Sequence, residues 1–258
     1  MLVVVSPAKR LDWTEQNIEQ TTPAMQADAV RLAKSARNLT LRDLKSLMDL
    51  SDDLARLNRD RFRAFQDEPN TDDTRSAMFA FAGDTYQGLD ARSFSEADVA
   101  RAQSHLRILS GLYGVLRPLD AIQPYRLEMG SRLKTRRGAS LYAYWRDQIA
   151  VSLNADAVDL GTDTLVNCAS QEYFGAVDRK ALRLNVVTPQ FLEVKGGVAK
   201  TISFFAKRAR GAMARYIVQN ALTAPSDLHA FDIDGYAFDA ERSTPEAPVF
   251  LRDAAMAA

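Results

Sequence analysis

The sequence predicts a mixed α/β protein that folds as one compact domain over residues 1–258. We expect a helix-rich first half and a mixed sheet built from the N-terminal strand and strands of the second half. Three observations lead to this prediction. The chain opens with a β-branched run typical of a buried strand, the following stretch carries several helix starts, and strand and helix signals mix after residue 160. No repeat, low-complexity tract or linker divides the chain.

The composition is that of a folded globular protein, with 47% apolar and 26% charged residues. No stretch approaches the ~18 consecutive apolar residues of a membrane helix, so we expect no membrane partner. Residues 1–9 lack a basic leader before their short apolar run, which favours a strand over a signal peptide. The single cysteine, Cys168, excludes an internal disulfide and fits a reducing cytoplasm. We therefore expect a cytoplasmic protein, and a monomer.

Metal-ligating residues of the nitrogen and sulfur type are scarce. The chain has two histidines and one cysteine, and no H-x-x-x-H or E-x-x-H pair. These counts argue against a zinc-type or di-iron centre, although carboxylates alone could still bind a cation. The expectation is a protein without a metal site or a cofactor.

The zero net charge hides a separation of charge along the chain. Residues 101–137 carry a net charge of +6 and residues 193–216 a net charge of +5, whereas residues 225–253 carry −5. If the two basic blocks meet in space, they form a surface that binds polyanions. The alternative is that neighbouring acidic residues neutralise each block.

The first half contains one predicted strand and several predicted helices. The continuous β-branched run from Leu2 to Val5 stops at Ser6-Pro7 and indicates a buried strand. Helix starts are predicted at Thr40, Ser51 and Ser95, each followed by an acidic residue in the first turn. The last of these helices is expected to reach Leu109, because apolar residues recur at helical spacing to that point. Residues 68–71 indicate a loop.

Strands and helices are mixed in the second half. Residues 164–169 indicate a short buried strand. The pair Gly196-Gly197 separates two strand-like runs, 191–195 and 198–205, and predicts a hairpin because glycine tolerates positive φ. An amphipathic helix is predicted over 206–222 and late strands near 236–238 and 249–251.

Residues 109–120 contain two glycines, Gly111 and Gly114, between apolar segments. Two helices joined by such a turn can direct backbone N–H groups outward to bind a phosphate oxygen. The segment is similar to a helix-hairpin-helix, although its Gly-Leu-Tyr-Gly turn is one residue longer than the usual Gly-apolar-Gly. The alternative is a helix that ends at Gly111 and a structural turn at Gly114.

Charged side chains follow several predicted strands, and ligand-binding residues of α/β proteins often occupy such positions. Ser6 follows the first strand, and Ser170 follows the strand at 164–169. The cleft built from these strand ends would contain six charged residues: Lys9, Arg126, Glu128, Glu172, Lys207 and Arg210. No catalytic triad, phosphate-binding loop or dinucleotide fingerprint accompanies them, so the residues alone assign no reaction. Each of them could also be structural.

Taken in order, six segments resemble the motifs of the YaaA family of bacterial peroxide-stress-resistance proteins. They are Ser6–Lys9, Phe81–Leu89, Leu109–Asp120, Pro124–Gly130, Asn167–Tyr173 and Ile202–Gly211. The resemblance covers residues 1 to about 252. It implies a cytoplasmic bacterial protein with an unusual single-domain α/β fold. It also implies survival of hydrogen peroxide through low intracellular iron, and DNA binding through a helix-hairpin-helix and a basic cleft.

The leading hypothesis is a stress protein that binds the DNA phosphate backbone without sequence specificity. Iron ligands are poor, so any lowering of iron is expected to be indirect. The expected DNA-binding residues are Lys9, Gly111, Tyr113, Gly114, Arg117, Arg126, Lys207, Arg208 and Arg210.

The alternative is an enzyme that acts on a nucleotide or another small anion. Its candidate catalytic residues are Glu128, Glu172, Tyr173 and Lys207, with Ser170 close by. Acidic groups inside a positive cleft repel phosphate but suit acid–base catalysis. A deep pocket that contains both Glu172 and Lys207 would support the enzyme, whereas an open groove lined mostly by cations would support DNA binding.

Overall fold

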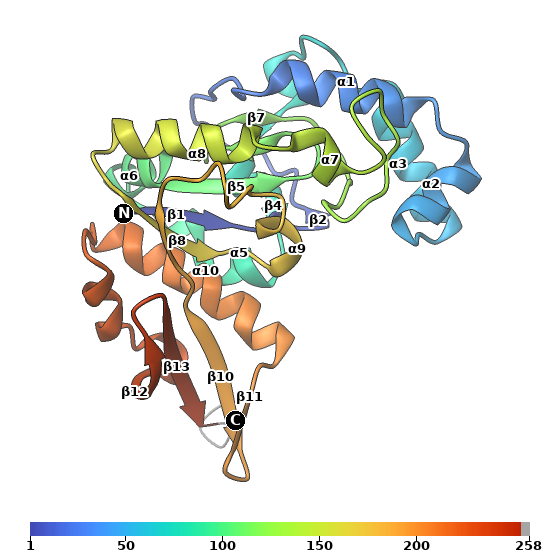
Figure 1. Cartoon of the computed structure of the whole chain (residues 1–258). Coiled ribbons are helices and arrows are strands. Elements are labelled where there is room, and N and C mark those ends of the chain that lie inside the picture. The colour runs from blue at the N-terminus through green and yellow to red at the C-terminus, as the bar shows by residue number, and fades with distance from the viewer. Residues whose placement is uncertain (254–258) are drawn as a thin grey trace.

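A five-stranded sheet forms the centre of the molecule, whose computed structural model describes residues 1–253 (Figure 1). Strand β1 (Leu2–Val5) pairs in parallel with β5 (Leu106–Ser110) on one side and β8 (Thr164–Cys168) on the other. Strand β9 (Asn185–Val187) continues the parallel set beside β8, and β6 (Gly114–Leu116) lies antiparallel to β5 at the opposite edge. The predicted mixed α/β class is confirmed.

Strand β1 occupies the middle of this sheet because all four of its residues are apolar. Leu2 to Val5 are fully buried, which fits a central parallel strand that is covered on both faces. Helix α8 (Gln148–Asp159) lies on one side of the sheet, and α10 (Ser203–Gln219) lies on the other beside α5 (Asp84–Leu89) (Figure 1). The strand predicted at the N-terminus is confirmed.

Three predicted helix starts are also confirmed. Each helix begins after a serine or threonine whose hydroxyl accepts a backbone N–H from three residues further along the chain. The helices are α2 (Leu41–Met48) after Thr40, α3 (Asp52–Ala64) after Ser51 and α6 (Glu96–His105) after Ser95. The expectation that the last helix reaches Leu109 is wrong, because α6 ends at His105 and strand β5 follows at once.

The remaining elements are short, apart from α1. The helices are α1 (Gln26–Arg37), α4 (Ala77–Ala80), α7 (Leu141–Trp145) and α9 (Gln171–Phe174). The strands β2 (Arg10–Leu11) and β4 (Phe81–Ala82) form one small antiparallel pair, and β3 (Arg75–Ser76) and β7 (Ala121–Ile122) form another. Four 3-10 turns cover Thr71–Asp73, Ala91–Ser93, Pro225–Ala230 and Ile233–Gly235.

The helix-hairpin-helix prediction for residues 109–120 is wrong. The segment contains the end of β5, a tight turn and β6, which together form a buried β-hairpin. A strand that is covered on both faces carries apolar residues at every position. Some of these residues therefore also recur at helical spacing, although the segment is not a helix. Gly114 has a φ of +69° at the start of β6.

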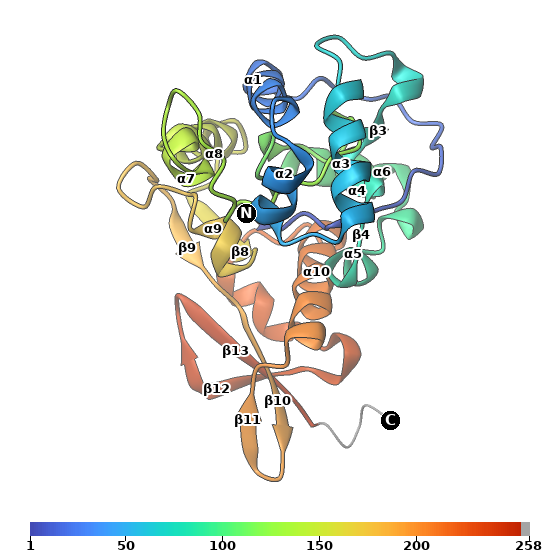
Figure 2. The same ribbon diagram turned by 90° about the vertical axis from the view of Figure 1, so that its right-hand side faces the viewer.

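A second sheet of four strands, in the order β11-β10-β13-β12, carries the C-terminal part of the described chain. Its members are β10 (Gln190–Lys195), β11 (Val198–Lys200), β12 (Ala237–Thr244) and β13 (Ala247–Asp253). The predicted hairpin at Gly196-Gly197 is confirmed, with φ of +59° and +77° at the two glycines. The strand predicted to reach residue 205 ends at Lys200 instead, since α10 begins at Ser203. The β10–β11 hairpin projects away from the rest of the molecule (Figure 2).

A buried ion pair inside this second sheet also contacts the start of α10. Arg252 Nε on β13 donates to Glu193 Oε2 on β10 over 2.8 Å, and the Tyr236 hydroxyl donates to the other oxygen of the same carboxylate. The guanidinium group of Arg252 lies 4.2 Å from the ring centre of Phe205, a residue of α10. The second sheet therefore packs against the first turn of the helix that carries Lys207 and Arg210.

No helix within residues 1–253 combines the length and the apolar character needed to cross a membrane.

Candidate functional site

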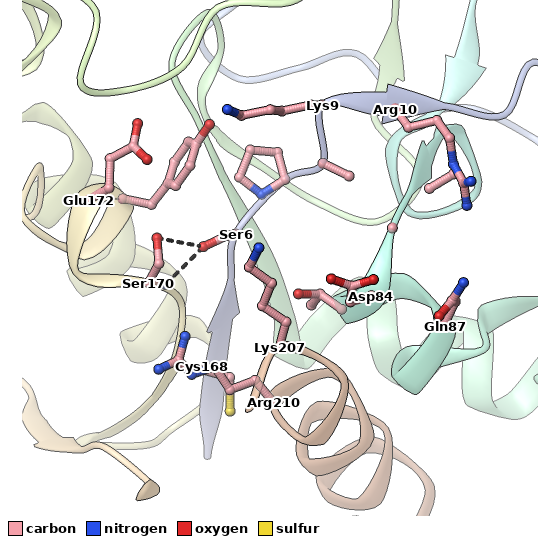
Figure 3. Close-up of a pocket in the computed structure, with 16 residues that line it drawn as sticks. Ser6, Lys9, Arg10, Asp84, Gln87, Cys168, Ser170, Glu172, Lys207 and Arg210 are labelled. Carbon is pink, nitrogen blue, oxygen red and sulfur yellow. Dashed lines mark hydrogen bonds between the residues drawn. The ribbon is translucent and has the colours of Figure 1, made fainter. Parts of the chain in front are cut away.

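A pocket of about 440 Å³ opens at the carboxyl ends of β1 and β8 (Figure 3). Four segments that are far apart in the sequence supply its walls. They are the chain from the end of β1 to the start of β2 (residues 6–10), the turn into α5 and its first residues (82–85 and 87), the end of β8 with the segment that follows (168, 170, 172 and 173) and the first turns of α10 (207 and 210). The volume lies within the range of roughly 300–1,000 Å³ that is typical of small-molecule sites.

The order of the strands explains why a pocket forms there. From β1 the chain continues to β5 on one side of the sheet, whereas from β8 it continues to β9 on the other side. The loops after these two adjacent strands therefore leave in opposite directions and open a crevice between them. Such a topological switch point is where open α/β sheets bind their ligands.

Two serines, one after each strand, meet at the base of this crevice. Ser6 Oγ accepts the backbone N–H of Ser170 over 2.9 Å and lies 3.3 Å from Ser170 Oγ, to which it donates. Figure 3 shows the pair between Glu172 and the end of Lys207. The two hydroxyls are fixed relative to each other, so the base of the pocket offers a preorganised hydrogen-bonding pair.

Lys207 and Arg210 give one wall of the pocket its positive charge. They lie three residues apart on α10 and both line the cavity. Neither side chain has a hydrogen bond or an ion pair with any residue of the described range 1–253. Two cations that face a cavity and form no ion pair of their own suit an anionic ligand.

Helix α5 lies against α10 at a distance that only glycine allows. A Cβ at Gly211 of α10 would lie 1.8 Å from the backbone oxygen of Thr85, and a Cβ at Gly88 of α5 would lie 2.0 Å from that of Arg208. The two helices therefore touch backbone to backbone. The contact fixes Asp84 and Gln87, which line the pocket from α5, relative to Lys207.

A carboxylate holds Lys9 at the rim of the pocket. Lys9 Nζ lies 3.2 Å from Glu128 Oε1, and the same oxygen accepts bonds from Arg126 Nε at 3.1 Å and Nη2 at 2.9 Å. The second carboxylate oxygen of Glu128 is buried and has no partner within residues 1–253. Lys9 lines the pocket, whereas Arg126 and Glu128 do not.

Glu172 and Tyr173 form the wall opposite α5. The backbone N–H of Gly130 donates to Glu172 Oε1 over 2.9 Å, which orients this exposed carboxylate. Burial raises the pKa of the Tyr173 hydroxyl, and the neighbouring Tyr125 and Glu172 raise it further. Tyr173 therefore stays protonated at neutral pH and can donate a hydrogen bond.

The family model described as "Peroxide stress protein YaaA" matches residues 1–242 of the chain. The chain belongs to this YaaA family. It is 70% identical over 252 residues to a UPF0246 protein of Ruegeria pomeroyi, a match that covers 98% of both chains. A UPF0246 protein of Roseobacter denitrificans is 66% identical over 254 residues and one of Caulobacter vibrioides 54% over 254 residues, each over at least 98% of both chains.

In this YaaA-family chain, three residues predicted to bind DNA lie inside the protein. Gly111, Tyr113 and Gly114 are buried in the β5–β6 hairpin. The Tyr113 hydroxyl accepts the backbone N–H of Gln123, and a Cβ at Gly111 would lie 2.3 Å from the backbone oxygen of Leu127. These residues are needed for close packing inside the hairpin, and the surface of the protein does not present them to a ligand.

Ion pairs occupy most of the first basic block of the YaaA-family chain. Five of its eight cations pair with acidic side chains, so the alternative of neutralised blocks describes it better than a polyanion surface. The five are Arg101, Arg107, Arg117, Arg126 and Arg137. Arg117 binds Asp120 and the backbone oxygen of Thr22.

A larger share of the cations in the second basic block has no ion pair within the described part of the chain. Arg208 pairs with Asp234 over 3.0 Å, away from the pocket, and Arg215 pairs with Asp90. Lys195, Lys200, Lys207 and Arg210 have no ion pair within residues 1–253. In this member of the YaaA family, the unpaired positive charge of the second block therefore lies along α10 and the projecting hairpin.

Three pocket residues with a charged or amide side chain were not predicted: Arg10, Asp84 and Gln87. Arg10 lies one residue beyond the Ser6–Lys9 motif, on β2. Asp84 and Gln87 belong to the Phe81–Leu89 motif of the YaaA family, to which the sequence assigned no chemistry. Their spacing of three residues places them on the same face of a helix, which is the signal that could have identified them.

Cys168 lines the pocket but should not react with peroxide. The side chain is almost completely buried, and burial raises its pKa to about 12. Because peroxide attacks the thiolate, and only on the order of 10⁻⁵ of such a thiol is ionised at pH 7, oxidation should be very slow. We expect no sulfenic acid on the folded protein after peroxide treatment, measured by mass spectrometry with a sulfenic-acid trap. The unfolded chain is the positive control, and rapid trapping on the folded protein would contradict the prediction.

Proposed function

We propose that this protein is an enzyme of the peroxide stress response that acts on a small anion, and that a phosphate ester is the anion that suits it best. The site of the reaction is the pocket at the carboxyl ends of β1 and β8. The observation that carries the proposal is that one cavity contains both Glu172 and Lys207. A surface that only coats DNA gains nothing from a carboxylate among its cations, because the carboxylate repels phosphate. An enzyme can use that carboxylate to move a proton.

The pocket residues suggest a division of roles. Lys207 and Arg210 bind the anionic group, and the hydroxyls of Ser6 and Ser170 add neutral hydrogen bonds at the base. Glu172, oriented by the backbone N–H of Gly130, is placed to accept or donate a proton. Tyr173 is a hydrogen-bond donor beside it, because its raised pKa keeps the hydroxyl protonated. Glu128 acts through Lys9 and is a positioning residue.

Binding of inorganic phosphate tests the anion site. Phosphate should raise the melting temperature of the parent protein, and saturation should give a shift of about 5 °C or more. Lys207→Ala and Arg210→Ala should each weaken phosphate binding about 10-fold or more, since each removes a charged hydrogen bond. The matched control is Lys200→Ala, an exposed and unpaired cation outside the pocket. Equal phosphate affinity in all four proteins would overturn the proposed site.

Turnover separates an enzyme from a binding protein. The parent and Glu172→Gln are incubated with a mixture of phosphorylated metabolites, and the products are compared by mass spectrometry. The parent should convert at least one compound that Glu172→Gln binds but does not convert. If neither protein converts any compound that binds, the pocket is a binding site and the enzyme proposal is wrong.

Binding of the DNA backbone is the second candidate, and exposed cations at the rim of the pocket and on α10 favour it. The side chain of Lys9 is 65% exposed and that of Arg208 is 47% exposed, and Lys207 is exposed as well. With Arg126 and Arg210 they could make about four to six phosphate contacts, which predicts a slope of roughly −4 to −5 for log affinity against log salt. A DNA affinity that does not change with salt concentration, or no affinity for any DNA form at low salt, would rule out this second candidate.

Neither candidate requires the protein to bind iron. No group of three or more histidine, cysteine or acidic side chains within residues 1–253 is arranged to hold a metal ion. We propose that any effect on intracellular iron is indirect, through the product of the pocket or through DNA. Both routes keep the cytoplasm as the proposed location and the monomer as the proposed state.

A further inference from the structure

Two of the helices that line the pocket, α10 and α5, present side chains of different chemistry. Figure 3 shows Lys207 and Arg210 of α10 near the two serines, and Asp84 and Gln87 of α5 on another side of the cavity. A ligand that reaches both helices must therefore present two different chemical groups. The anionic group suits α10, and the part that faces α5 must be acceptable to a carboxylate.

Asp84 restricts what the second group can be. The side chain is half-buried, lines the pocket and has no hydrogen bond or ion pair within residues 1–253. An ionised carboxylate only accepts hydrogen bonds, so it selects N–H or O–H donors and repels a second anion. The amide of Gln87, one turn further on, both donates and accepts. Together they suit a neutral group that carries several hydrogen-bond donors as well as an acceptor.

Resting on the proposed function, we infer that the substrate of this pocket is a nucleoside monophosphate. Its phosphate would be bound by Lys207, Arg210 and the two serines, and its nucleoside part by Asp84 and Gln87. Sugar hydroxyls and the edges of bases are neutral and rich in donors, as the carboxylate requires. Arg10, which lines the same side of the pocket and has no partner within residues 1–253, offers a planar guanidinium on which a base can stack.

The dimensions and the rigidity of the pocket support a ligand larger than phosphate. A cavity of about 440 Å³ leaves most of its space empty around a single phosphate group. The contact of Gly88 and Gly211 holds α5 against α10 backbone to backbone, so the separation between the cations and Asp84 is fixed. A site with two binding ends at a fixed separation selects a ligand by its length as well as by its charge.

Isothermal titration with a matched set of ligands tests this inference. The set contains inorganic phosphate, ribose 5-phosphate, the four common ribonucleoside monophosphates and the corresponding nucleosides. At least one nucleoside monophosphate should bind 10-fold or more tightly than phosphate. A gain already present in ribose 5-phosphate would place the sugar at Asp84, and a gain only in the nucleotide would place the base there.

Asp84→Asn keeps the shape of the side chain but replaces one acceptor oxygen with a donor. It should weaken the preferred nucleotide 10-fold or more and leave phosphate affinity unchanged or slightly higher. Asp53→Asn, at an exposed acid on α3, should change neither affinity. Lys207→Ala should weaken both ligands.

The outcomes separate the two proposals. If phosphate binding depends on Lys207 but no nucleotide exceeds phosphate, or Asp84→Asn leaves the nucleotide affinity unchanged, the nucleotide inference is wrong and the anion site stands. If Lys207→Ala leaves both affinities unchanged, the proposed anion site is wrong, and the nucleotide inference falls with it. Asp84→Ala provides a second variant if the asparagine fails to fold, with the same expected pattern.

Discussion

Gly211→Ala is expected to destabilise the protein by about 3 kcal/mol or more, although alanine is the better helix former. In a helix interior, replacing glycine with alanine ordinarily stabilises by roughly 0.5–1 kcal/mol. Here the new Cβ would lie 1.8 Å from the backbone oxygen of Thr85, a position that no real Cβ occupies. Backbone cannot rotate away as a side chain can, so α5 and α10 must separate.

Urea denaturation measures this loss, and two further variants define its cause. Gly88→Ala should cost a similar amount, because its Cβ would lie 2.0 Å from the backbone oxygen of Arg208. Gly161→Ala is the control: it has a φ of +61° and nothing within 4 Å of its Cβ, so it should cost only about 1 kcal/mol of backbone strain. A Gly211→Ala protein as stable as the parent would show that the backbones of α5 and α10 are not in contact.

The same substitution should also reduce phosphate affinity at a temperature where the variant is folded. Separation of the helices moves Asp84 away from Lys207 and Arg210 and distorts the cavity between them. Gly161→Ala, far from this contact, should bind phosphate like the parent.

Arg252→Ala is expected to cost about 3–5 kcal/mol of stability, the range for breaking a buried ion pair. The side chain of Glu193 is only 1% exposed, and loss of the guanidinium would leave its carboxylate with the Tyr236 hydroxyl alone. The variant also loses the contact of the guanidinium with Phe205 of α10. Urea denaturation should show the loss as a lower midpoint.

An exposed pair in the same sheet provides the control for Arg252. Arg242 on β12 binds Asp239 but is half-exposed, so Arg242→Ala should cost less than about 1 kcal/mol. The double variant Glu193→Gln/Arg252→Met removes both charges and should recover part of the stability, since no unpaired charge remains buried. A cost for Arg252→Ala no larger than that for Arg242→Ala would contradict a stabilising role for the pair.

Local signals in the sequence predicted much of the fold, and long-range packing decided the rest. The strand Leu2–Val5, the caps at Thr40, Ser51 and Ser95, and the Gly196-Gly197 turn depend on neighbouring residues, and all were predicted correctly. Residues 106–116 could not be assigned in the same way. An apolar run is equally compatible with a buried helix and a buried strand. This run forms a strand because it pairs with β1, which lies about 100 residues earlier in the chain.

In the candidate site, too, local signals predicted one part and long-range packing determined the other. The rule that ligand residues follow parallel strands placed Ser6 and Ser170 correctly at the carboxyl ends of β1 and β8, where the structure joins them by a hydrogen bond. Asp84 and Gln87 reach the pocket only because two glycines, Gly88 and Gly211, allow two distant helices to touch. No local pattern reports such a contact, so this wall of the pocket was not predicted.

The central position of β1 has a consequence for synthesis of the chain on the ribosome. Strand β1 (Leu2–Val5) is synthesised before both of its neighbours, because β5 begins at Leu106 and β8 at Thr164. At about 5–20 residues per second, roughly 5–20 s pass before the first neighbour is made. During that time the nascent chain carries four consecutive apolar residues without a sheet to join. We therefore expect the β1 segment of the growing chain to be a binding site for holdase chaperones, and the pocket to form only when α10 has left the ribosome.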